Sequence, residues 1–350
     1  MGIGATILMT IFFPLNSFLL LQEAFSGGSQ VEANVSTASI ADDNGLVKGV
    51  ESQKKEKSSG SKPQAVETPK YQVVRKDGIN DLVVPNAHAS VIIDAESGTI
   101  LHYNEGRTHR QIASLTKIMT AVLAVEKIKD LDKEEIEIDE EAIYADGTKI
   151  GCPRSGFCNS QRLKIGEKVS ARNLLRAALI NSANDAAIAL GKHIAGSQND
   201  FADMMNKKAK ELGLTDTHFC TASGLEEPAG QEKECYSSAY DIARIAAYSL
   251  RYKDIWNVYK SSFSEDNLEI SSADEKTKHS LINTVSNLLQ VPNALGGKTG
   301  FTPLAGYSLL TVAADPSGKH QIVSVVLDDI NRWQDIKTMT NWAFASYEWK

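Results

Sequence analysis

Ser114 and Lys117 lie three residues apart in the sequence Gln-Ile-Ala-Ser-Leu-Thr-Lys-Ile-Met-Thr-Ala, which spans positions 111–121. Residues with this spacing share one face of a helix, so the two side chains are expected to project together near the helix start. A serine hydroxyl is a weak nucleophile at neutral pH and needs a neighbouring base. A lysine can be that base when burial and a second cation disfavour its charged form. The pair predicts nucleophilic catalysis, although by itself this spacing also fits an N-cap serine and a surface lysine.

Two further segments place polar residues in apolar surroundings. Asn-Ser-Ala-Asn-Asp at 181–185 separates two apolar helical runs, and Gly-Gly-Lys-Thr-Gly-Phe-Thr at 296–302 precedes a predicted strand. Lys298 would be the second cation near Lys117. The order and separation of the three segments allow three elements of one domain to converge on a cleft. A phosphate-binding loop is excluded, because position 292 is proline where that loop needs glycine, and a strand follows where it needs a helix.

The motifs S-x-x-K, S-x-N and K-T-G, in this order, mark penicillin-binding proteins and serine β-lactamases. Their surroundings, together with S-G-L, S-S-A-Y-D-I-A and G-G-K-T-G-F-T-P-L-A-G-Y-S, resemble the low-molecular-mass D-alanyl-D-alanine carboxypeptidases from about residue 72 to the end. The resemblance implies a serine peptidase that removes the terminal D-alanine of peptidoglycan stem peptides through an acyl-enzyme. It implies no cofactor and no metal, and β-lactam antibiotics as covalent inhibitors.

The resemblance also implies a role for each motif residue. Four residues would be catalytic: the nucleophile Ser114, its base Lys117, the proton relay Ser182, and Asn184, which would hold the substrate's peptide. Five would bind substrate, and three of these, Lys298, Thr299 and Thr302, would contact the terminal carboxylate. The backbone N–H of Phe301 would form the oxyanion hole with that of Ser114. Gly300 would leave room for a substrate that lies against the strand.

Composition and charge narrow the class of protein. The 350 residues are 42% hydrophobic and 23% charged, which is enough apolar content for at least one large core. A net charge of −7 argues against a nucleic-acid partner, which would select a basic surface. Residues 1–26 are expected to be a cleaved signal peptide or a membrane anchor, residues 27–70 a disordered linker, and residues 71–350 the catalytic domain.

The apolar pattern predicts an α+β fold with helices between two sets of strands. A β-hairpin is predicted over residues 89–104, and a second strand pair turns at Pro316-Ser317-Gly318. Helices are predicted over residues 114–127, 171–195 with a break, 199–212, 238–251 and 332–347. Strands at both ends of the domain predict one antiparallel sheet covered by helices, and the resemblance adds a helical subdomain.

Four cysteines, at positions 152, 158, 220 and 235, predict disulfides in an exported chain. The expected pairs are local, Cys152 with Cys158 and Cys220 with Cys235, but three pairings are open. His218 lies close to Cys220 in the sequence, so a zinc site is an alternative for this region.

The resemblance leaves rival activities open. Better-known members carry a β-rich domain and an amphipathic membrane helix after the catalytic domain, whereas this sequence ends at Lys350, so membrane attachment would depend on the N-terminal segment. The rivals are a DD-endopeptidase that cuts cross-links, a serine β-lactamase and a non-catalytic penicillin sensor. An E-x-x-L-N segment after S-x-N would favour a β-lactamase, but neither Glu211 nor Glu226-Glu227 has this pattern.

Overall fold

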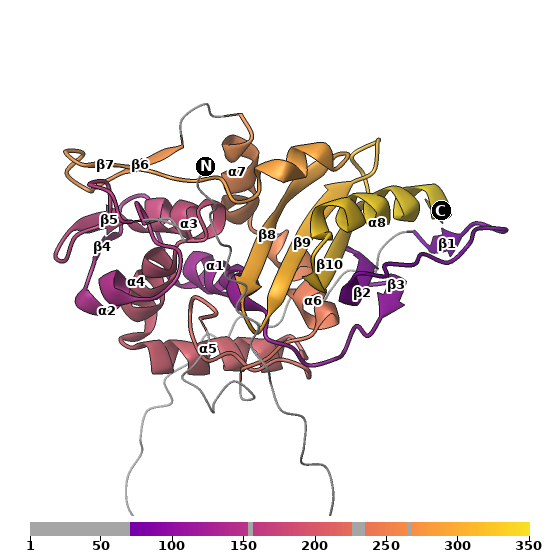
Figure 1. Ribbon diagram of the computed structural model, residues 1–350, viewed down its shortest axis with the longest axis horizontal. Coiled ribbons are helices and arrows are strands. Elements are labelled where there is room, and N and C mark those ends of the chain that lie inside the picture. The colour runs from indigo at the N-terminus through magenta and orange to yellow at the C-terminus, as the bar shows by residue number, and fades with distance from the viewer. Residues whose placement is uncertain (1–70, 153–156, 226–234, 265–267) are drawn as a thin grey trace, which may run out of the picture. The chain divides into compact units, whose positions relative to one another are not determined.

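The computed structural model describes residues 71–152, 157–225, 235–264 and 268–350 (Figure 1). The expected leader, residues 1–26, and linker, residues 27–70, lie outside these ranges, as do Glu226 and Glu227. Within them, no helix is long and apolar enough to cross a membrane.

A five-stranded antiparallel sheet forms the centre of the described region. Its strands are β2 (Ala87–Asp94), β3 (Ile100–Asn104), β8 (Ala294–Thr302), β9 (Gly306–Ala314) and β10 (Gln321–Asp329), in the order β3-β2-β10-β9-β8. Val325 of β10 pairs with Val91 of β2, so the first hairpin joins strands from the far end of the chain. Both predicted strand pairs and the single antiparallel sheet are confirmed. Residues 296–302, which the apolar pattern places before a strand and the resemblance places on one, form most of β8 itself.

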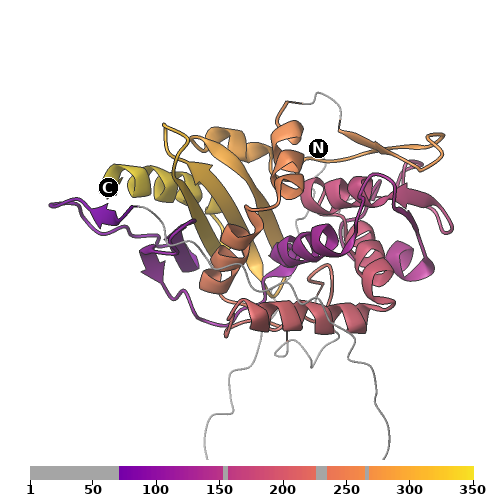
Figure 2. The same cartoon turned by 180° about the vertical axis from the view of Figure 1, so that it is seen from behind.

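Helices cover both faces of this sheet. Helix α8 (Arg332–Ser346) lies on one face and α6 (Ala239–Ser249) on the other, as the two opposite views show (Figures 1 and 2). Strands covered on both sides bury successive residues, which explains why β9 and β10 are mostly apolar and buried without alternation. The α+β class is therefore confirmed.

The remaining helices pack together beyond the β8 edge of the sheet (Figure 1). They are α1 (Lys117–Lys127), α2 (Glu140–Tyr144), α3 (Ala171–Ile180), α4 (Asn184–Ala195), α5 (Gln198–Glu211) and α7 (Lys253–Ser262), with 3₁₀ helices η1 (Ala113–Thr116) and η2 (Ser286–Gln290). The predicted break within residues 171–195 falls between α3 and α4. Serine side chains accept from backbone N–H groups at three helix starts, at Ser170, Ser197 and Ser238.

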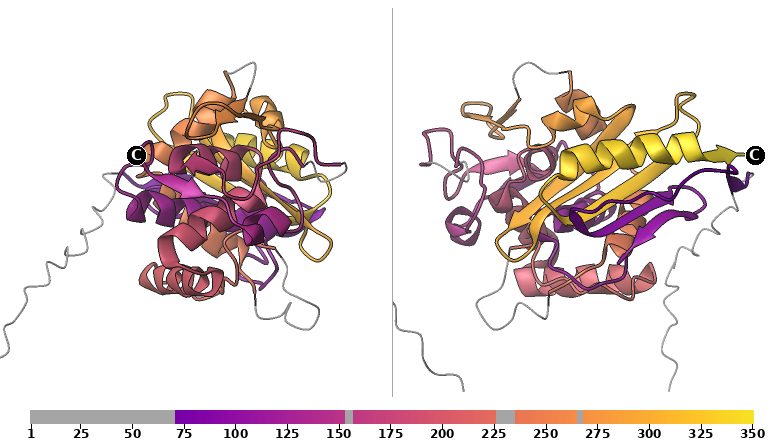
Figure 3. Two further views of the ribbon diagram at one scale, coloured as in Figure 1. Left: turned by 90° about the vertical axis from the view of Figure 1, so that its left-hand side faces the viewer. Right: turned by 45° about the vertical axis from the view of Figure 1, so that its right-hand side comes forward.

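Three short strand pairs complete the structure. Strand β1 (Val73–Arg75) pairs with β11 (Tyr347–Trp349) where α8 ends (Figure 3), β4 (Glu135–Glu137) pairs with β5 (Lys168–Ser170), and β6 (Glu269–Ser271) pairs with β7 (Lys278–Ser280). The sequence patterns predict none of these strands, nor α2 and α7. Both expected disulfides form, Cys152 with Cys158 and Cys220 with Cys235.

Candidate active site

The serine turn joins the sheet to the helical part. Ser114 lies in the 3₁₀ turn η1, which packs against β8 and continues directly into α1. Ala113 takes a left-handed backbone with φ of 47°, which is uncommon for a residue with a side chain. The predicted helix over residues 114–127 is thus present, but its first turn is tighter than an α-helix. Lys117 is the first residue of α1 and is wholly buried.

Lys117 contacts the nucleophile and two other oxygen atoms, all uncharged. Its Nζ lies 2.8 Å from Ser114 Oγ, 2.7 Å from Asn184 Oδ1 and 2.8 Å from the backbone oxygen of Ser223. Burial, reinforced by the charge of Lys298, holds the pKa of Lys117 well below its usual value, while Asp185 acts in the opposite direction. A neutral amine carries two N–H groups and one lone pair. With both N–H groups donated to the two carbonyl oxygens, the lone pair faces Ser114.

Lys298 forms a second buried cationic position beside this one. Its Nζ donates to Ser182 Oγ at 2.8 Å and to the backbone oxygen of Thr299 at 2.9 Å. Burial lowers the pKa of Lys298 to about 7. Ser182 occupies the break between α3 and α4 with a left-handed φ of 58°. Asn181 fixes this break, because its Oδ1 accepts from Ile282 N at 2.6 Å.

Gly300 has a packing reason that differs from the expected one. A Cβ atom there would lie 2.7 Å from the backbone oxygen of Ile112, in the residues leading into the serine turn. The missing side chain thus brings β8 against the nucleophile's own backbone. This packing is a further reason for the glycine, and the expected room for a substrate stays a prediction.

A pocket of about 270 Å³ opens above the nucleophile. Four of the predicted residues line it: Ser114, Asn184, Phe301 and Thr302. The other lining residues are Asp146, Gly147, Thr148, Ser223, Gly224, Leu225 and Pro303. Lys117, Ser182, Lys298 and Thr299 do not line it, and both lysines are wholly buried. The site therefore exposes the hydroxyl of Ser114 to the pocket and keeps its base out of water.

Three contributors to this site have no catalytic motif of their own. The backbone oxygen of Asp146 accepts from Asn184 Nδ2 at 2.7 Å, which orients the amide so that Oδ1 faces Lys117. Asp185 is buried and accepts from the backbone N–H groups of Ile150 and Ala186. Ser223 contributes its carbonyl oxygen. In the sequence, Ser223 stands out only as part of the Ser-Gly-Leu sequence that contributes to the family resemblance. That sequence does not indicate that the carbonyl oxygen of Ser223 contacts Lys117.

The zinc alternative is wrong for this region. Cys220 and Cys235 bond to each other, so neither sulfur is a free thiolate ligand for His218 to complement. Among the described residues, no three His, Cys, Asp or Glu side chains are grouped so that they could hold a metal ion.

Known proteins resemble this chain in sequence and in fold. A peptidase S11 family model described as D-alanyl-D-alanine carboxypeptidase matches residues 81–331. The chain is 32% identical over 270 residues to D-alanyl-D-alanine carboxypeptidase DacF of Bacillus subtilis, covering 75% of this chain and 63% of that protein. It is 34% identical over 266 residues to DacC of Escherichia coli, covering 75% and 62%. It thus matches less than two thirds of the length of these relatives.

Solved structures agree with these matches. The crystal structure of D-alanyl-D-alanine carboxypeptidase from Mycobacterium tuberculosis has a TM-score of 0.65 at 27% identity, covering 78% of this chain and 96% of that one. Penicillin binding protein 5 from Haemophilus influenzae has a TM-score of 0.63 at 31% identity, covering 77% and 73%. Together with the family match, these similarities show that the chain belongs to the D-alanyl-D-alanine carboxypeptidase family.

Proposed function

We propose that this chain is a serine-type D-Ala-D-Ala carboxypeptidase that removes the terminal D-alanine from peptidoglycan stem peptides. One observation carries the proposal: the buried Lys117 amine has two carbonyl oxygens for its two N–H groups and lies 2.8 Å from Ser114 Oγ. This geometry suits a general base that takes the serine proton. Membership of the family supplies the substrate class.

In the proposed acylation step, Ser114 Oγ attacks the carbonyl carbon before the last D-alanine and Lys117 Nζ accepts its proton. The backbone N–H groups of Ser114 and Phe301 stabilise the oxyanion that forms. Ser182, which accepts from Lys298, donates its proton to the nitrogen of the departing D-alanine and takes in its place the proton that Lys117 removed from Ser114, so Lys117 is again a neutral amine. Water activated by Lys117 then hydrolyses the ester on Ser114 and restores the enzyme.

We assign substrate binding to the two sides of the pocket. Asn184, on the α4 side, holds the substrate's peptide, and Thr302, on the β8 side, lines the pocket and donates its hydroxyl to the terminal carboxylate. Lys298 is wholly buried, so it acts on the carboxylate through its charge in a water-poor site, while Thr299 beside it is half-buried. Binding of the terminal carboxylate would let the enzyme distinguish a free C-terminal D-alanine from an internal residue.

Mass analysis of two defined substrates tests the function. A stem pentapeptide ending in D-Ala-D-Ala should lose one D-alanine, while a cross-linked muropeptide without a free D-Ala-D-Ala terminus should remain intact. Cleavage of the cross-link with the pentapeptide left intact would replace the proposal with a DD-endopeptidase. Rapid penicillin hydrolysis without action on either peptide would indicate a β-lactamase.

We further propose that the enzyme works outside the cytoplasm, with peptidoglycan as its partner and β-lactams as covalent inhibitors. The apolar residues before Glu23 support export, either as an anchor or as a leader that is removed. Residues 71–350 would then be the catalytic domain and residues 27–70 its tether. Cell fractionation of the full chain tests this, since an anchored enzyme stays in the membrane fraction and a cleaved one does not, and recovery in the cytoplasm would contradict export.

A further inference from the structure

A backbone carbonyl outside the three catalytic motifs holds part of the base. Ser223 O accepts from Lys117 Nζ at 2.8 Å, and Ser223 begins the Ser-Gly-Leu sequence of residues 223–225. The mechanism above gives this sequence no task. Ser223 lies in the stretch from Cys220 to Leu225, which we call the 220–225 segment.

The Ser223 carbonyl matters because it limits how the Lys117 amine can turn. Asn184 Nδ2 donates to the Asp146 carbonyl, so Asn184 presents Oδ1, which can only accept, to Lys117. Ser223 O is a second pure acceptor. Two such oxygens take both N–H groups of the neutral amine and leave its lone pair for Ser114. Without Ser223 O, the amine can rotate and point an N–H group at the nucleophile, which is unproductive for proton transfer.

Close packing fixes the 220–225 segment against the serine turn. Ala222 O accepts from Thr120 Oγ1 at 2.6 Å, so the residues before Ser223 are tied to α1. Gly224 has a left-handed φ of 74°, and a Cβ atom there would lie 2.0 Å from the backbone oxygen of Ala113 and 2.6 Å from Thr116 Oγ1. Only glycine fits this approach. The carbonyl of Ser223 is therefore held from both sides.

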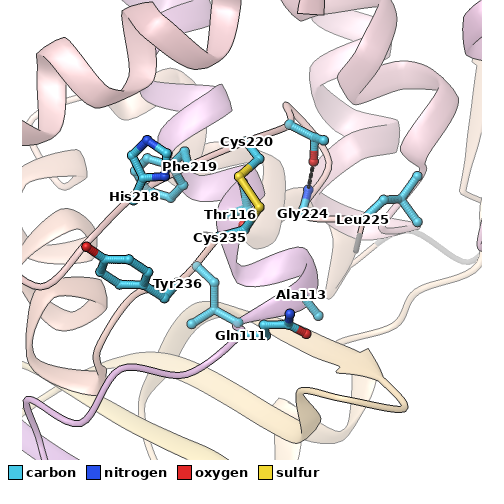
Figure 4. Close-up of a pocket in the computed structure, with 12 residues that line it drawn as sticks. Gln111, Ala113, Thr116, His218, Phe219, Cys220, Gly224, Leu225, Cys235 and Tyr236 are labelled. Atoms are coloured by element: carbon cyan, nitrogen blue, oxygen red, sulfur yellow. Dashed lines mark hydrogen bonds between the residues drawn. A yellow bond between two sulfur atoms is a disulfide. The ribbon is translucent and has the colours of Figure 1, made fainter. Parts of the chain in front are cut away.

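The Cys220–Cys235 disulfide fixes the start of this segment (Figure 4). Cys235 precedes Tyr236, whose backbone exchanges two hydrogen bonds with His218, at 2.8 and 3.0 Å. Ser237 exchanges two more, both 2.9 Å, with Arg110, close to the serine turn in the sequence. Both cysteines, Gly224 and Ala113 line one void of about 30 Å³. A void of this size holds a water molecule or two and no peptide, so the region is a packing junction.

We infer that the Cys220–Cys235 disulfide and Gly224 hold the Ser223 carbonyl where it orients the Lys117 amine, which makes Ser223 a positioning residue for acylation. The inference rests on the proposed function, because it assumes that Lys117 is the base for Ser114. It predicts that a disulfide outside the three motifs controls the rate of acylation.

Two perturbing variants and two matched controls test the inference. The double variant Cys220→Ala/Cys235→Ala releases the segment, and Gly224→Ala displaces it. Cys152→Ala/Cys158→Ala removes the other disulfide. Gly166→Ala places a side chain at a similar φ of 79°, but with no atom within 4 Å of its Cβ. Each purified full-length chain is reacted with a fluorescent penicillin over a range of pH, and its thermal unfolding is recorded.

Both perturbing variants should acylate about tenfold more slowly or worse, since general-base catalysis contributes on the order of 10²–10⁴ in rate. The acid limb of their rate profile should also move to lower pH. A carbonyl oxygen binds an ammonium group more strongly than an amine, so losing it lowers the pKa of Lys117 further. The two controls should keep the wild-type rate and profile.

A uniform loss of rate with an unchanged pH profile would overturn the inference, as would wild-type behaviour of the released segment. If Gly224→Ala does not fold, the disulfide variant decides. A wild-type chain that fails to react with penicillin and to release D-alanine would instead overturn the proposed function, and this inference with it.

Discussion

Lys117 and Lys298 share a residue type and complete burial, yet their surroundings suit different tasks. The described residues include no acidic hydrogen-bond partner for either Nζ atom. Burial lowers the pKa of Lys298 to about 7, and the charge of Lys298 adds to burial in lowering the pKa of Lys117. These surroundings therefore favour the free amine of Lys117, while Lys298 still carries part of its charge near neutral pH. Two groups whose environments separate their pKa values can act as base and cation in one site.

The nucleophile assignment predicts the loss of covalent labelling in one variant. Ser114→Ala should not be labelled by a fluorescent penicillin, because the β-lactam carbonyl has no hydroxyl to acylate. Gel fluorescence after denaturation measures the covalent adduct. A folded Ser114→Ala chain that still becomes labelled would show that another side chain is the nucleophile.

The pair of lysines predicts a direction for the pH dependence of acylation. The base must be neutral, so the rate should fall as pH drops through the pKa of Lys117. Lys298→Met removes the cation that helps to depress this pKa, and the acid limb should therefore move to higher pH. Lys298→Arg keeps a charge at this position and serves as the control, with an acid limb that does not move upward. The acylation rate as a function of pH measures both, and a limb unmoved in Lys298→Met would contradict the coupling.

The same cation predicts selectivity for a free carboxylate. Amidating the C-terminus of the peptide substrate should lower kcat/KM. The lost transition-state stabilisation should be on the order of 1.5–3 kcal/mol, the range of a charge-assisted contact. Lys298→Met should reduce the difference between acid and amide, since its cause is removed. Equal turnover of both peptides by the wild-type enzyme would exclude this role and favour an endopeptidase.

At the scale of elements, Asp185 connects the start of α4 to the pocket wall. Its carboxyl accepts from Ile150 N and Ala186 N, and burial raises its pKa from 3.8 to about 7. A pKa raised by folding means that stability falls as pH rises from near 4 to near 7, where the buried carboxyl ionises. The side chain introduced by Asp185→Asn cannot ionise. The melting temperature of the variant minus that of the wild type should therefore increase between about pH 4 and pH 7 and then level off.

Thermal unfolding at several pH values measures this difference. Asp200→Asn is a suitable control, because Asp200 also lies in the first turn of a helix but is exposed. Its melting temperature should show no such rise relative to wild type. A constant difference for Asp185→Asn at all pH values would mean that folding does not raise the pKa of Asp185.

The sequence predicts elements well where local chemistry is strong. Long apolar runs give β9 and β10, and serine caps mark the starts of α3, α5 and α6. The three-residue strands β4 to β7 have too few residues for a pattern, and only tertiary pairing selects them. Helix α7 buries Ile255, Trp256, Val258 and Tyr259, and the sequence pattern does not predict it.

The sequence also predicts side chains of the site better than its backbone. The motifs identify Ser114, Lys117 and Lys298 because their side chains carry the chemistry. Ser223 contributes a carbonyl oxygen, which every residue has, so no residue type signals it. Gly300 is visible as a motif glycine, but only the structure shows that the backbone of Ile112 lies too close to it for a side chain.

At the scale of the molecule, the site lies where the sheet meets the helices. Strand β8 supplies Lys298 and Phe301, the break between α3 and α4 supplies Ser182, and η1 supplies Ser114. Of the described residues that line the pocket between them, Asp146 is the acidic one, and its backbone oxygen is already bonded to Asn184. Glu211 lies at the end of α5 and does not line this pocket. Among the described residues, the arrangement thus favours acylation and includes no E-x-x-L-N glutamate of the kind with which class A β-lactamases activate water.

This arrangement predicts that the penicilloyl-enzyme persists while the peptide turns over. With Lys117 as the base for water, the bulky penicilloyl group retains its leaving amine and obstructs the path from Lys117 to the ester. D-alanine instead departs and leaves room for water. Radiolabelled penicillin followed by a chase with unlabelled drug measures the loss of label, and a parallel assay measures D-alanine release.

Retention of label through many peptide turnovers is the expected result for the wild-type chain. Asp146→Asn should retain the label equally long, because Asp146 is not expected to activate water. Label lost as fast as peptide is hydrolysed would place the enzyme with the β-lactamases. If Asp146→Asn then prolonged the label, Asp146 would be the deacylating base, since removing a water-activating carboxylate slows ester hydrolysis and leaves acylation by Ser114 and Lys117 intact.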